Sequence, residues 1–159
     1  MDEFFRGFIS FAPTGHFCAL SLTGEDSDMD KKAFLDGKTI LIAEDLDWNF
    51  KYLEVMLSKL NNAKVMWAKD GIEAVFKCKN HPEIDLVLMD IQMPELDGYN
   101  AARQIKEFRP ELPIIAHTAY AMYEERELCL SAGCCAYIAK PVRKDELIEE
   151  IRMALQKSN

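Results

Sequence analysis

The sequence predicts an α/β fold in which a parallel β-sheet carries helices on both faces. Short apolar runs of strand length alternate with stretches in which apolar residues recur at helical spacing, and polar or glycine-containing turns separate them. Such alternation is typical of a parallel sheet, because each parallel pair needs a long crossover connection. Right-handed crossovers leave few ways to connect the strands.

The expected strands are apolar runs bounded by polar residues, which is the pattern of strands buried on both faces. The alternation begins at Gly37, and the third run ends on the carboxylate of Asp90. In chain order the runs cover Thr39–Ala43, Lys64–Ala68, Leu86–Met89, Ile114–His117 and Cys135–Ala139.

The expected helices are placed by apolar stripes and by capping residues. Phe50, Leu53 and Leu57 share a stripe, and Asp47 is suited to cap this first helix. Gly133 is suited to end the fourth helix. The helices run from about Trp48 to Leu60, Gly71 to Lys79, Gly98 to Phe108, Tyr120 to Ser131 and Lys144 to Gln156.

Residues 1–36 differ from the rest, so we divide the chain into an N-terminal extension or linker and a domain at 37–157. The extension is rich in phenylalanine, and its stretch from Gly24 to Lys32 is acidic and polar, as linkers are. Phe8–Phe11 and His16–Leu22 have a strand–turn–strand pattern, but a lone hairpin is marginal in water. We expect a segment that is either docked on the domain or disordered.

The composition argues against several classes of function. The 159 residues carry a net charge of −8, whereas nucleic-acid backbones are bound by basic faces. Five cysteines without a CxxC pair indicate reduced thiols rather than a zinc or thioredoxin motif. Because no apolar run spans a bilayer and no signal peptide is evident, we expect a cytoplasmic protein without direct membrane insertion.

Five polar side chains lie at the carboxyl ends of the expected strands, where open parallel sheets bind ligands. They are Glu44 and Asp45 after the first strand, Asp90 after the third, Thr118 after the fourth and Lys140 after the fifth. Neighbouring carboxylates need a counter-charge, and Mg²⁺ is the usual one beside phosphate. A carboxylate nucleophile faced by a metal, a lysine and a hydroxyl is what phosphoryl transfer requires.

Each of these residues also has a structural interpretation. Asp45 is able to cap the first helix, and Lys140 to lie on the surface. Thr118 is able to act as a plain strand-end hydroxyl, and Tyr137 as a core tyrosine. The histidines show no metal-ligand spacing and are interpreted as structural or surface residues: His16, His81 and His117.

Residues 37–156 resemble the receiver domain of two-component response regulators. Each matching motif is weak alone, but together, in order and at strand ends, they are specific. They are Ala43-Glu44-Asp45, Met89-Asp90-Ile91-Gln92-Met93-Pro94, Asp97-Gly98, Thr118-Ala119 and Tyr137-Ile138-Ala139-Lys140-Pro141. The resemblance implies a flavodoxin-like (βα)5 fold with strand order 2-1-3-4-5.

The resemblance also implies roles for the site residues. Asp90 would accept a phosphoryl group from a phosphohistidine on a sensor histidine kinase or phosphotransfer protein. Asp45 and Asp90 would bind Mg²⁺ (or Mn²⁺) by their side chains and Gln92 by its backbone carbonyl, with Glu44 acting indirectly. Lys140 would pair with the phosphoryl oxygens.

A switch between two states is implied as well. Thr118 would shift to hydrogen-bond the phosphoryl group, and Tyr137 would swing inward. This couples the site to the face made by the fourth helix, fifth strand and last helix, where a partner or a second copy would dock. Pro141 is a candidate for a cis peptide bond, which only X-Pro bonds adopt readily.

Three positions depart from the commonest family pattern. Glu44 stands where aspartate is more usual, and Leu46 where a polar residue is frequent. Tyr120 is bulky and lies two residues after Thr118, a place that influences water access to the phosphoryl group. We hypothesise that Tyr120 with Gln92 slows hydrolysis. No departure removes a group that the chemistry needs, so we expect a working receiver.

Two other functions stay open at this stage. A haloacid-dehalogenase-like phosphatase also combines an aspartate nucleophile, a threonine, a lysine and Mg²⁺, but its nucleophile follows the first strand in a DxD pattern and Asp90 does not. The second is an interaction module that works without phosphorylation. For a receiver, the chain is either a stand-alone protein or the receiver end of a hybrid sensor kinase.

Overall fold

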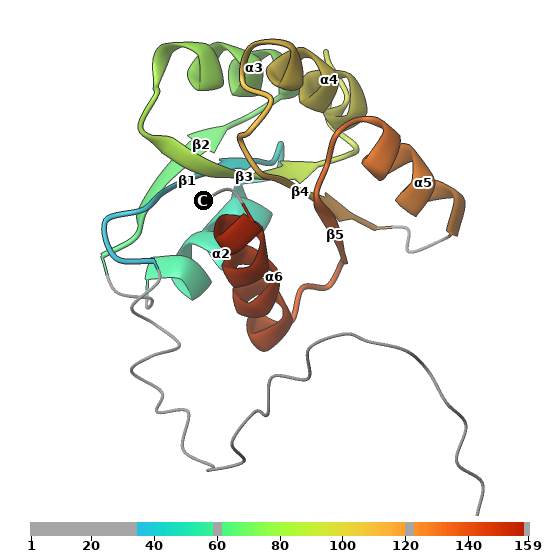
Figure 1. The fold of residues 1–159 in the computed structure, drawn as a ribbon. Helices are drawn as coiled ribbons and strands as arrows, with labels where there is room; N and C mark the ends of the chain where they lie inside the picture. The colour runs from blue at the N-terminus through green and yellow to red at the C-terminus, as the bar shows by residue number, and fades with distance from the viewer. Residues whose placement is uncertain (1–34, 59–61, 120–122, 158–159) are drawn as a thin grey trace, which may run out of the picture.

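The computed structural model describes residues 35–58, 62–119 and 123–157, which form a five-stranded parallel sheet with helices on both faces (Figure 1). The strand order is β2-β1-β3-β4-β5, and every neighbouring pair is parallel. The predicted flavodoxin-like fold is therefore confirmed. The strands are β1 (Thr39–Ala43), β2 (Lys64–Ala68), β3 (Ile84–Asp90), β4 (Ile114–Thr118) and β5 (Ala136–Ala139).

The helices form two layers that enclose the sheet. In Figure 1, α2 and α6 lie on one side of the sheet and α3, α4 and α5 on the other. None of the described helices is long and apolar enough to cross a membrane. The helices are α2 (Asp47–Ser58), α3 (Gly71–Asn80), α4 (Gly98–Phe108), α5 (Tyr123–Ser131) and α6 (Lys144–Lys157).

The element boundaries differ from the predicted ones by a few residues. Asp47, predicted as a cap, is the first residue of α2, whereas Asp70 and Asp97 cap α3 and α4 by accepting hydrogen bonds from backbone N–H groups. The sequence could not separate these cases, because an aspartate favours both the cap and the first turn. The predicted hairpin, the predicted end of the first helix at Leu60 and the predicted start of the fourth at Tyr120 lie outside the described residues.

The core consists of two apolar clusters, one on each face of the sheet. On β1, Leu41 and Ala43 belong to the cluster under α3, α4 and α5, whereas Ile40 and Ile42 belong to the cluster under α2 and α6. Successive side chains point to opposite faces of a strand, so a strand buried on both faces must be apolar throughout. Leu35, just before β1, is fully buried in the second cluster.

The strand register sets the position of the site. Ala43 pairs with Met89 across β1 and β3, Asp90 with His117 across β3 and β4, and Thr118 with Ala139 across β4 and β5. The carboxyl ends of these four strands therefore meet at one edge of the sheet. The residues that follow them are brought together there, although they are up to 96 positions apart in sequence.

Gly98 allows the chain after β3 to fold back against the end of that strand. Its N–H donates to the Ile91 carbonyl at 3.0 Å, and a Cβ on Gly98 would lie 2.1 Å from the backbone oxygen of Asp90. The atoms nearest to this Cβ belong to the backbone of Asp90 and Ile91. A side chain at Gly98 could therefore be accommodated only by moving the loop that carries the site.

Gly98→Ala is expected to destabilise the fold by about 1–3 kcal/mol, as overpacking against backbone does. Urea unfolding of the variant and the wild type measures this difference. Gln104→Ala, on an exposed position of the same helix, is the matched control and should change stability by less than about 0.5 kcal/mol. Equal stability of the Gly98→Ala variant and the wild type would contradict the close approach described here.

Candidate functional site

Asp90 and Lys140 form the centre of the site at the carboxyl edge of the sheet. Asp90 ends β3 and is only 3% exposed. The Lys140 Nζ atom, from the loop after β5, donates to Asp90 Oδ2 at 2.8 Å and to Glu44 Oε2 at 3.0 Å. The Gln92 N–H donates to the other Asp90 oxygen at 3.2 Å. One ammonium group thus bridges two buried carboxylates.

Glu44 is fully buried and is held from several sides. Besides Lys140, the Asn49 side-chain amide donates to Glu44 Oε1 at 2.9 Å. The Trp67 indole N–H donates to the Glu44 backbone carbonyl at 2.8 Å, and the Trp67 ring stacks on Phe50 at 4.5 Å. The start of α2 and the end of β2 therefore fix the segment that carries the acidic pair.

Glu44, Asp45 and Asp90 form a cluster that fits a divalent cation. One carboxylate oxygen from each lies within 4.8 Å of the others. A set of oxygen donors suits Mg²⁺, a hard cation that prefers carboxylates and water. The predicted indirect ligand Glu44 thus lies in the cluster with both predicted direct ones. Gln92, the fourth predicted ligand, follows Asp90 closely and is exposed.

The electrostatics of the cluster favour an added cation. Burial raises the pKa of both the Asp90 and Glu44 carboxyls, and neighbouring carboxylates raise them further, while hydrogen bonds from Lys140 act in the opposite direction. Burial alone would lower the pKa of Lys140, but its bonds to the two carboxylates outweigh this and raise it. The lysine therefore stays charged, and its single charge does not balance three carboxylates.

The two predicted switch residues, Thr118 and Tyr137, are placed on neighbouring strands. Thr118 is 1% exposed, and its hydroxyl donates to Glu125 Oε2 on α5 at 3.0 Å. The Arg126 guanidinium lies over the half-buried ring of Tyr137, 5.8 Å from its centroid. Thr118 lies at the predicted strand end but is bonded toward α5. Tyr120 lies outside the described residues, and the Lys140–Pro141 peptide bond is cis.

Sequence reasoning missed three residues that support the site. His117, interpreted as structural or surface, is 6% exposed, and its Nδ1 atom lies 3.8 Å from Glu44 Oε2. Burial lowers the pKa of His117 to about 3, so its imidazole is neutral. Asn49 and Trp67 are the others. Their only signal was position, since His117 directly precedes Thr118 and Asn49 follows the acidic pair closely.

A cavity of about 560 Å³ adjoins the site between α2 and the loop after β5. Aromatic and aliphatic side chains dominate its lining, and Lys140 links it to the acidic cluster. A group entering this cavity would therefore come close to the carboxylates. The lining residues are Trp48, Asn49, Tyr52, Leu53, His117, Lys140, Pro141 and Val142.

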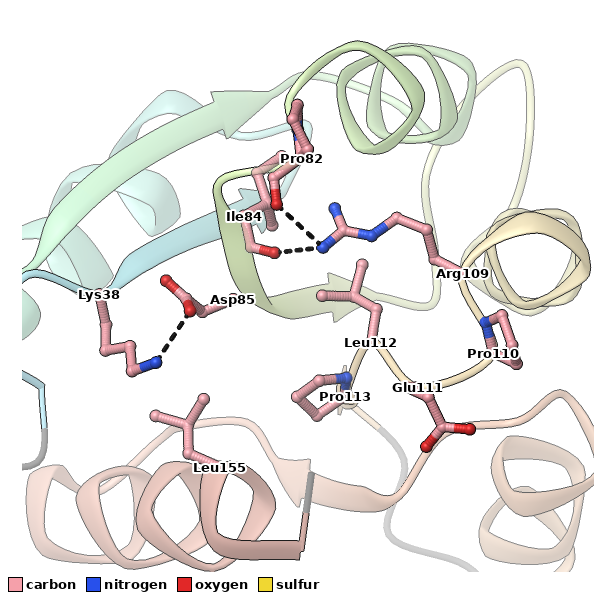
Figure 2. A pocket seen from close by; sticks show the side chains of 10 residues that line it. All are labelled: Lys38, Pro82, Ile84, Asp85, Arg109, Pro110, Glu111, Leu112, Pro113 and Leu155. Atoms are coloured by element: carbon pink, nitrogen blue, oxygen red, sulfur yellow. Dashed lines mark hydrogen bonds and ion pairs between the residues drawn. The ribbon is translucent and has the colours of Figure 1, made fainter. Parts of the chain in front are cut away.

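A second hollow, of about 300 Å³, lies at the opposite edge of the sheet and has a structural role (Figure 2). Its basic side chains are engaged: Lys38 pairs with Asp85 at 2.9 Å, and Arg109 donates to the backbone carbonyl of Ile84 at 2.6 Å and to that of Pro82. The Arg109 bonds fasten the end of α4 to the start of β3 and to the loop before it, and the Lys38–Asp85 pair fastens the segment before β1 to β3. The hollow does not touch the acidic cluster.

The fold and the acidic cluster define a response regulator receiver domain. Residues 40–152 match this family, and the chain belongs to it. It is a phosphoacceptor domain of two-component signalling, and its cluster of Glu44, Asp45 and Asp90 is arranged so that it could hold a metal ion.

Two curated relatives differ greatly in length. The chain is 38% identical over 119 residues to Hybrid signal transduction histidine kinase H of Dictyostelium discoideum, a match that covers 72% of this chain and 9% of the kinase. It is 35% identical over 121 residues to the polar-differentiation response regulator DivK of Brucella anthropi, covering 74% of this chain and 96% of DivK. The chain therefore spans about a tenth of the first relative and almost all of the second.

Solved structures give the same fold. The receiver domain of sensor histidine kinase PA1611 from Pseudomonas aeruginosa, crystallised with a magnesium ion coordinated in the active site cleft, is 39% identical with a TM-score of 0.69, covering 76% of this chain and 98% of that one. A second similar structure is a chain from the co-crystal of the Saccharomyces cerevisiae phosphotransfer protein Ypd1 and the receiver domain of Ssk1. It is 31% identical with a TM-score of 0.68, and the match covers 74% of this chain and 88% of that one.

Mg²⁺ is expected to stabilise the folded chain, because its expected site is a cluster of carboxylates that only folding brings together. Magnesium chloride added to EDTA-treated protein should raise the Tm, corresponding to about 2.7 kcal/mol at a hundredfold excess over Kd. Asp45→Asn should abolish most of the shift. Asp47→Asn, on the exposed first residue of α2, should retain it. An equal shift in both variants would place the ion elsewhere.

Asp90→Asn is expected to stabilise the metal-free protein. Because burial raises the pKa of Asp90, the folded state holds this proton at a higher pH than the unfolded chain does. Stability therefore falls as the pH rises from the pKa of Asp90 in the unfolded chain towards its raised pKa in the folded state. Removing the charge should raise the free energy of unfolding by on the order of 1 kcal/mol. Lys140 stays paired in the variant, because it keeps its hydrogen bond to Glu44.

Urea unfolding in EDTA at neutral and at acidic pH measures this effect. The gain from Asp90→Asn should shrink at acidic pH, where Asp90 is protonated in both states. Asp85→Asn is a contrasting control, because it weakens hydrogen bonds to Lys38 and to the Thr39 N–H and should lower stability. A loss of stability in Asp90→Asn at neutral pH would show that the pairing with Lys140 outweighs the burial cost.

Proposed function

We propose that this receiver accepts a phosphoryl group on Asp90 from a phosphohistidine, and that the modification switches a protein-interaction face. The phosphorus–nitrogen bond of the donor breaks, and a phosphorus–oxygen bond to the Asp90 carboxylate forms. The observation that carries the proposal is the Lys140 ammonium 2.8 Å from Asp90, beside two further carboxylates. This places a nucleophile, a cation and a metal site around one point at a strand end.

Each neighbouring group has a role in this proposal. Asp45, Asp90 and the Gln92 carbonyl, with Glu44 nearby, would hold Mg²⁺, which would supply charge stabilisation for the transferred group. Lys140 pairs with a phosphoryl oxygen, for which it must exchange one of its carboxylate contacts. Because the receiver provides these groups itself, we infer that it catalyses its own phosphorylation and a slow dephosphorylation.

The partner is a sensor histidine kinase or a phosphotransfer protein. The Ypd1–Ssk1 co-crystal is a precedent for such a pairing in a relative. The apolar cavity beside Lys140 and the exposed Trp48 and Tyr52 on α2 supply a surface on which a donor helix would bring its phosphohistidine to Asp90. We infer a cytoplasmic location, since a kinase domain would supply the phosphoryl group there.

The signal leaves through the face made by α5, β5 and α6. Thr118 lies on β4, between β3 with Asp90 and β5 with Tyr137, and Leu128 and Leu130 of α5 are exposed large apolar residues. We propose that phosphorylation changes this face and that a second copy or another partner docks on it. Light scattering of the phosphorylated form tests the homodimer, and a monomer would exclude it.

Two further proposals involve segments that the structure does not fully describe. Tyr120, acting with Gln92, is proposed to slow hydrolysis of the phosphoryl group by restricting water. Residues 1–36 are proposed to be an extension or linker to the receiver domain at 37–157, either in a stand-alone protein or at the receiver end of a hybrid kinase.

Incubation with acetyl phosphate and Mg²⁺ is expected to add a single phosphoryl group to the wild type, measured by intact mass. Asp90→Asn should show no adduct, and neither should the wild type in EDTA. Asp97→Asn, which alters only a helix cap, is the matched control and should be phosphorylated. An adduct on Asp90→Asn would exclude Asp90 as the acceptor, and turnover of a small phosphate ester would favour a phosphatase instead.

A further inference from the structure

Two consecutive residues of α5 contact the two proposed switch residues. Glu125 accepts the hydrogen bond from the Thr118 hydroxyl, and Arg126 places its guanidinium over the Tyr137 ring. Thr118 and Tyr137 lie on adjacent parallel strands, β4 and β5. A single turn of α5 therefore engages both side chains that would move on phosphorylation.

The Thr118–Glu125 bond excludes the proposed activated state. A threonine hydroxyl has one proton to donate. While Thr118 donates that proton to Glu125 at 3.0 Å, it cannot donate it to a phosphoryl oxygen on Asp90. The acceptor is a carboxylate, and Thr118 is 1% exposed, so the bond is charge-assisted and partly shielded from water.

The Arg126–Tyr137 contact acts in the same direction. A cation over an aromatic face is attracted by the negative charge density of the ring, and this contact places the guanidinium 5.8 Å from the centroid. Tyr137 packs against the apolar cluster of the α3, α4 and α5 face. An inward swing of the ring would take it away from Arg126.

We propose that Glu125 and Arg126 form a latch that stabilises the unphosphorylated arrangement of Thr118 and Tyr137. Glu125 is a positioning residue in this proposal: it acts on Asp90 chemistry only through the Thr118 hydroxyl. The inference rests on the proposed roles of Asp90 and Thr118. A ligand that requires the released threonine binds only to molecules in which the latch is open. Its apparent Kd is the intrinsic Kd divided by the fraction of such molecules.

The test titrates the full chain with beryllium fluoride and Mg²⁺, a mimic of the phosphorylated carboxylate. Tryptophan fluorescence follows binding, since Trp67 bonds to the Glu44 carbonyl beside the site. Glu125→Ala should raise the apparent affinity about three- to tenfold, the range expected for loss of one net hydrogen bond. Glu125→Gln, which keeps an uncharged acceptor, should give a smaller increase. Arg126→Gln should raise it about twofold.

Two controls separate a latch from a structural effect. Glu127→Ala, on an exposed position of the same helix, should leave the affinity unchanged. In a Thr118→Ala background, Glu125→Ala should also have no effect, because the bond is already absent. Thermal unfolding of each variant reports stability separately, and a purely structural role would lower the Tm without raising the affinity.

Three outcomes would overturn the latch. The first is unchanged or weaker binding of beryllium fluoride in both Glu125 variants. The second is a change in affinity caused by Glu125→Ala that persists when Thr118 is replaced by alanine. Failure of the wild type to bind beryllium fluoride would remove the activated state itself and would overturn the proposed function as well. Wild-type binding with unresponsive Glu125 variants would overturn the latch alone.

Discussion

The site depends on one lysine placed between two buried carboxylates. Lys140 bonds to both Asp90 and Glu44, which are almost inaccessible to water. An uncompensated charge in such a place costs several kcal/mol, so each carboxylate needs the lysine to remain ionised. Asp45 adds a third negative charge at the rim. The excess negative charge left after this pairing is the physical reason that the cluster suits a divalent cation.

The parallel sheet makes this charge arrangement possible. Four strand ends meet at one edge through register pairs, and the apolar clusters on both faces hold the strands rigidly. Glu44 is then held by two neighbours that have no proposed chemical role, Asn49 and Trp67, and by Lys140 of the site itself. Positioning of this kind limits side-chain motion, which favours a group that must react in one geometry.

The same edge of the sheet joins Asp90, the proposed phosphoacceptor, to a distant surface. Asp90 pairs in register with His117, and Thr118, the next residue, is bonded to α5. A change at Asp90 therefore has to cross only one strand to reach a helix on the outer face. In the proposed switch, the threonine proton has a single acceptor at a time, so the coupling would be a choice between two bonds rather than a gradual displacement.

Much of the molecule follows from local sequence pattern. The apolar runs and helical stripes predicted the alternating elements, and the carboxylates, threonine and lysine at strand ends predicted which edge carries the site. Boundaries were less certain, as for Asp47, because one residue type favours adjacent positions at a helix start. The sequence left open whether His117 is a structural or a surface residue, since its burial beside Glu44 arises from strand pairing and not from its sequence neighbours.

The sequence by itself determined the class of fold and the chemical groups at its functional edge, because strand and helix periodicity and strand-end polarity are local properties. Only the tertiary structure decided which partners those groups have. Lys140 bridges Asp90 and Glu44 across separations of 50 and 96 residues, and the Thr118 hydroxyl is directed to Glu125. These choices depend on distances of a few ångströms between side chains of different elements, and such distances are set by packing and register.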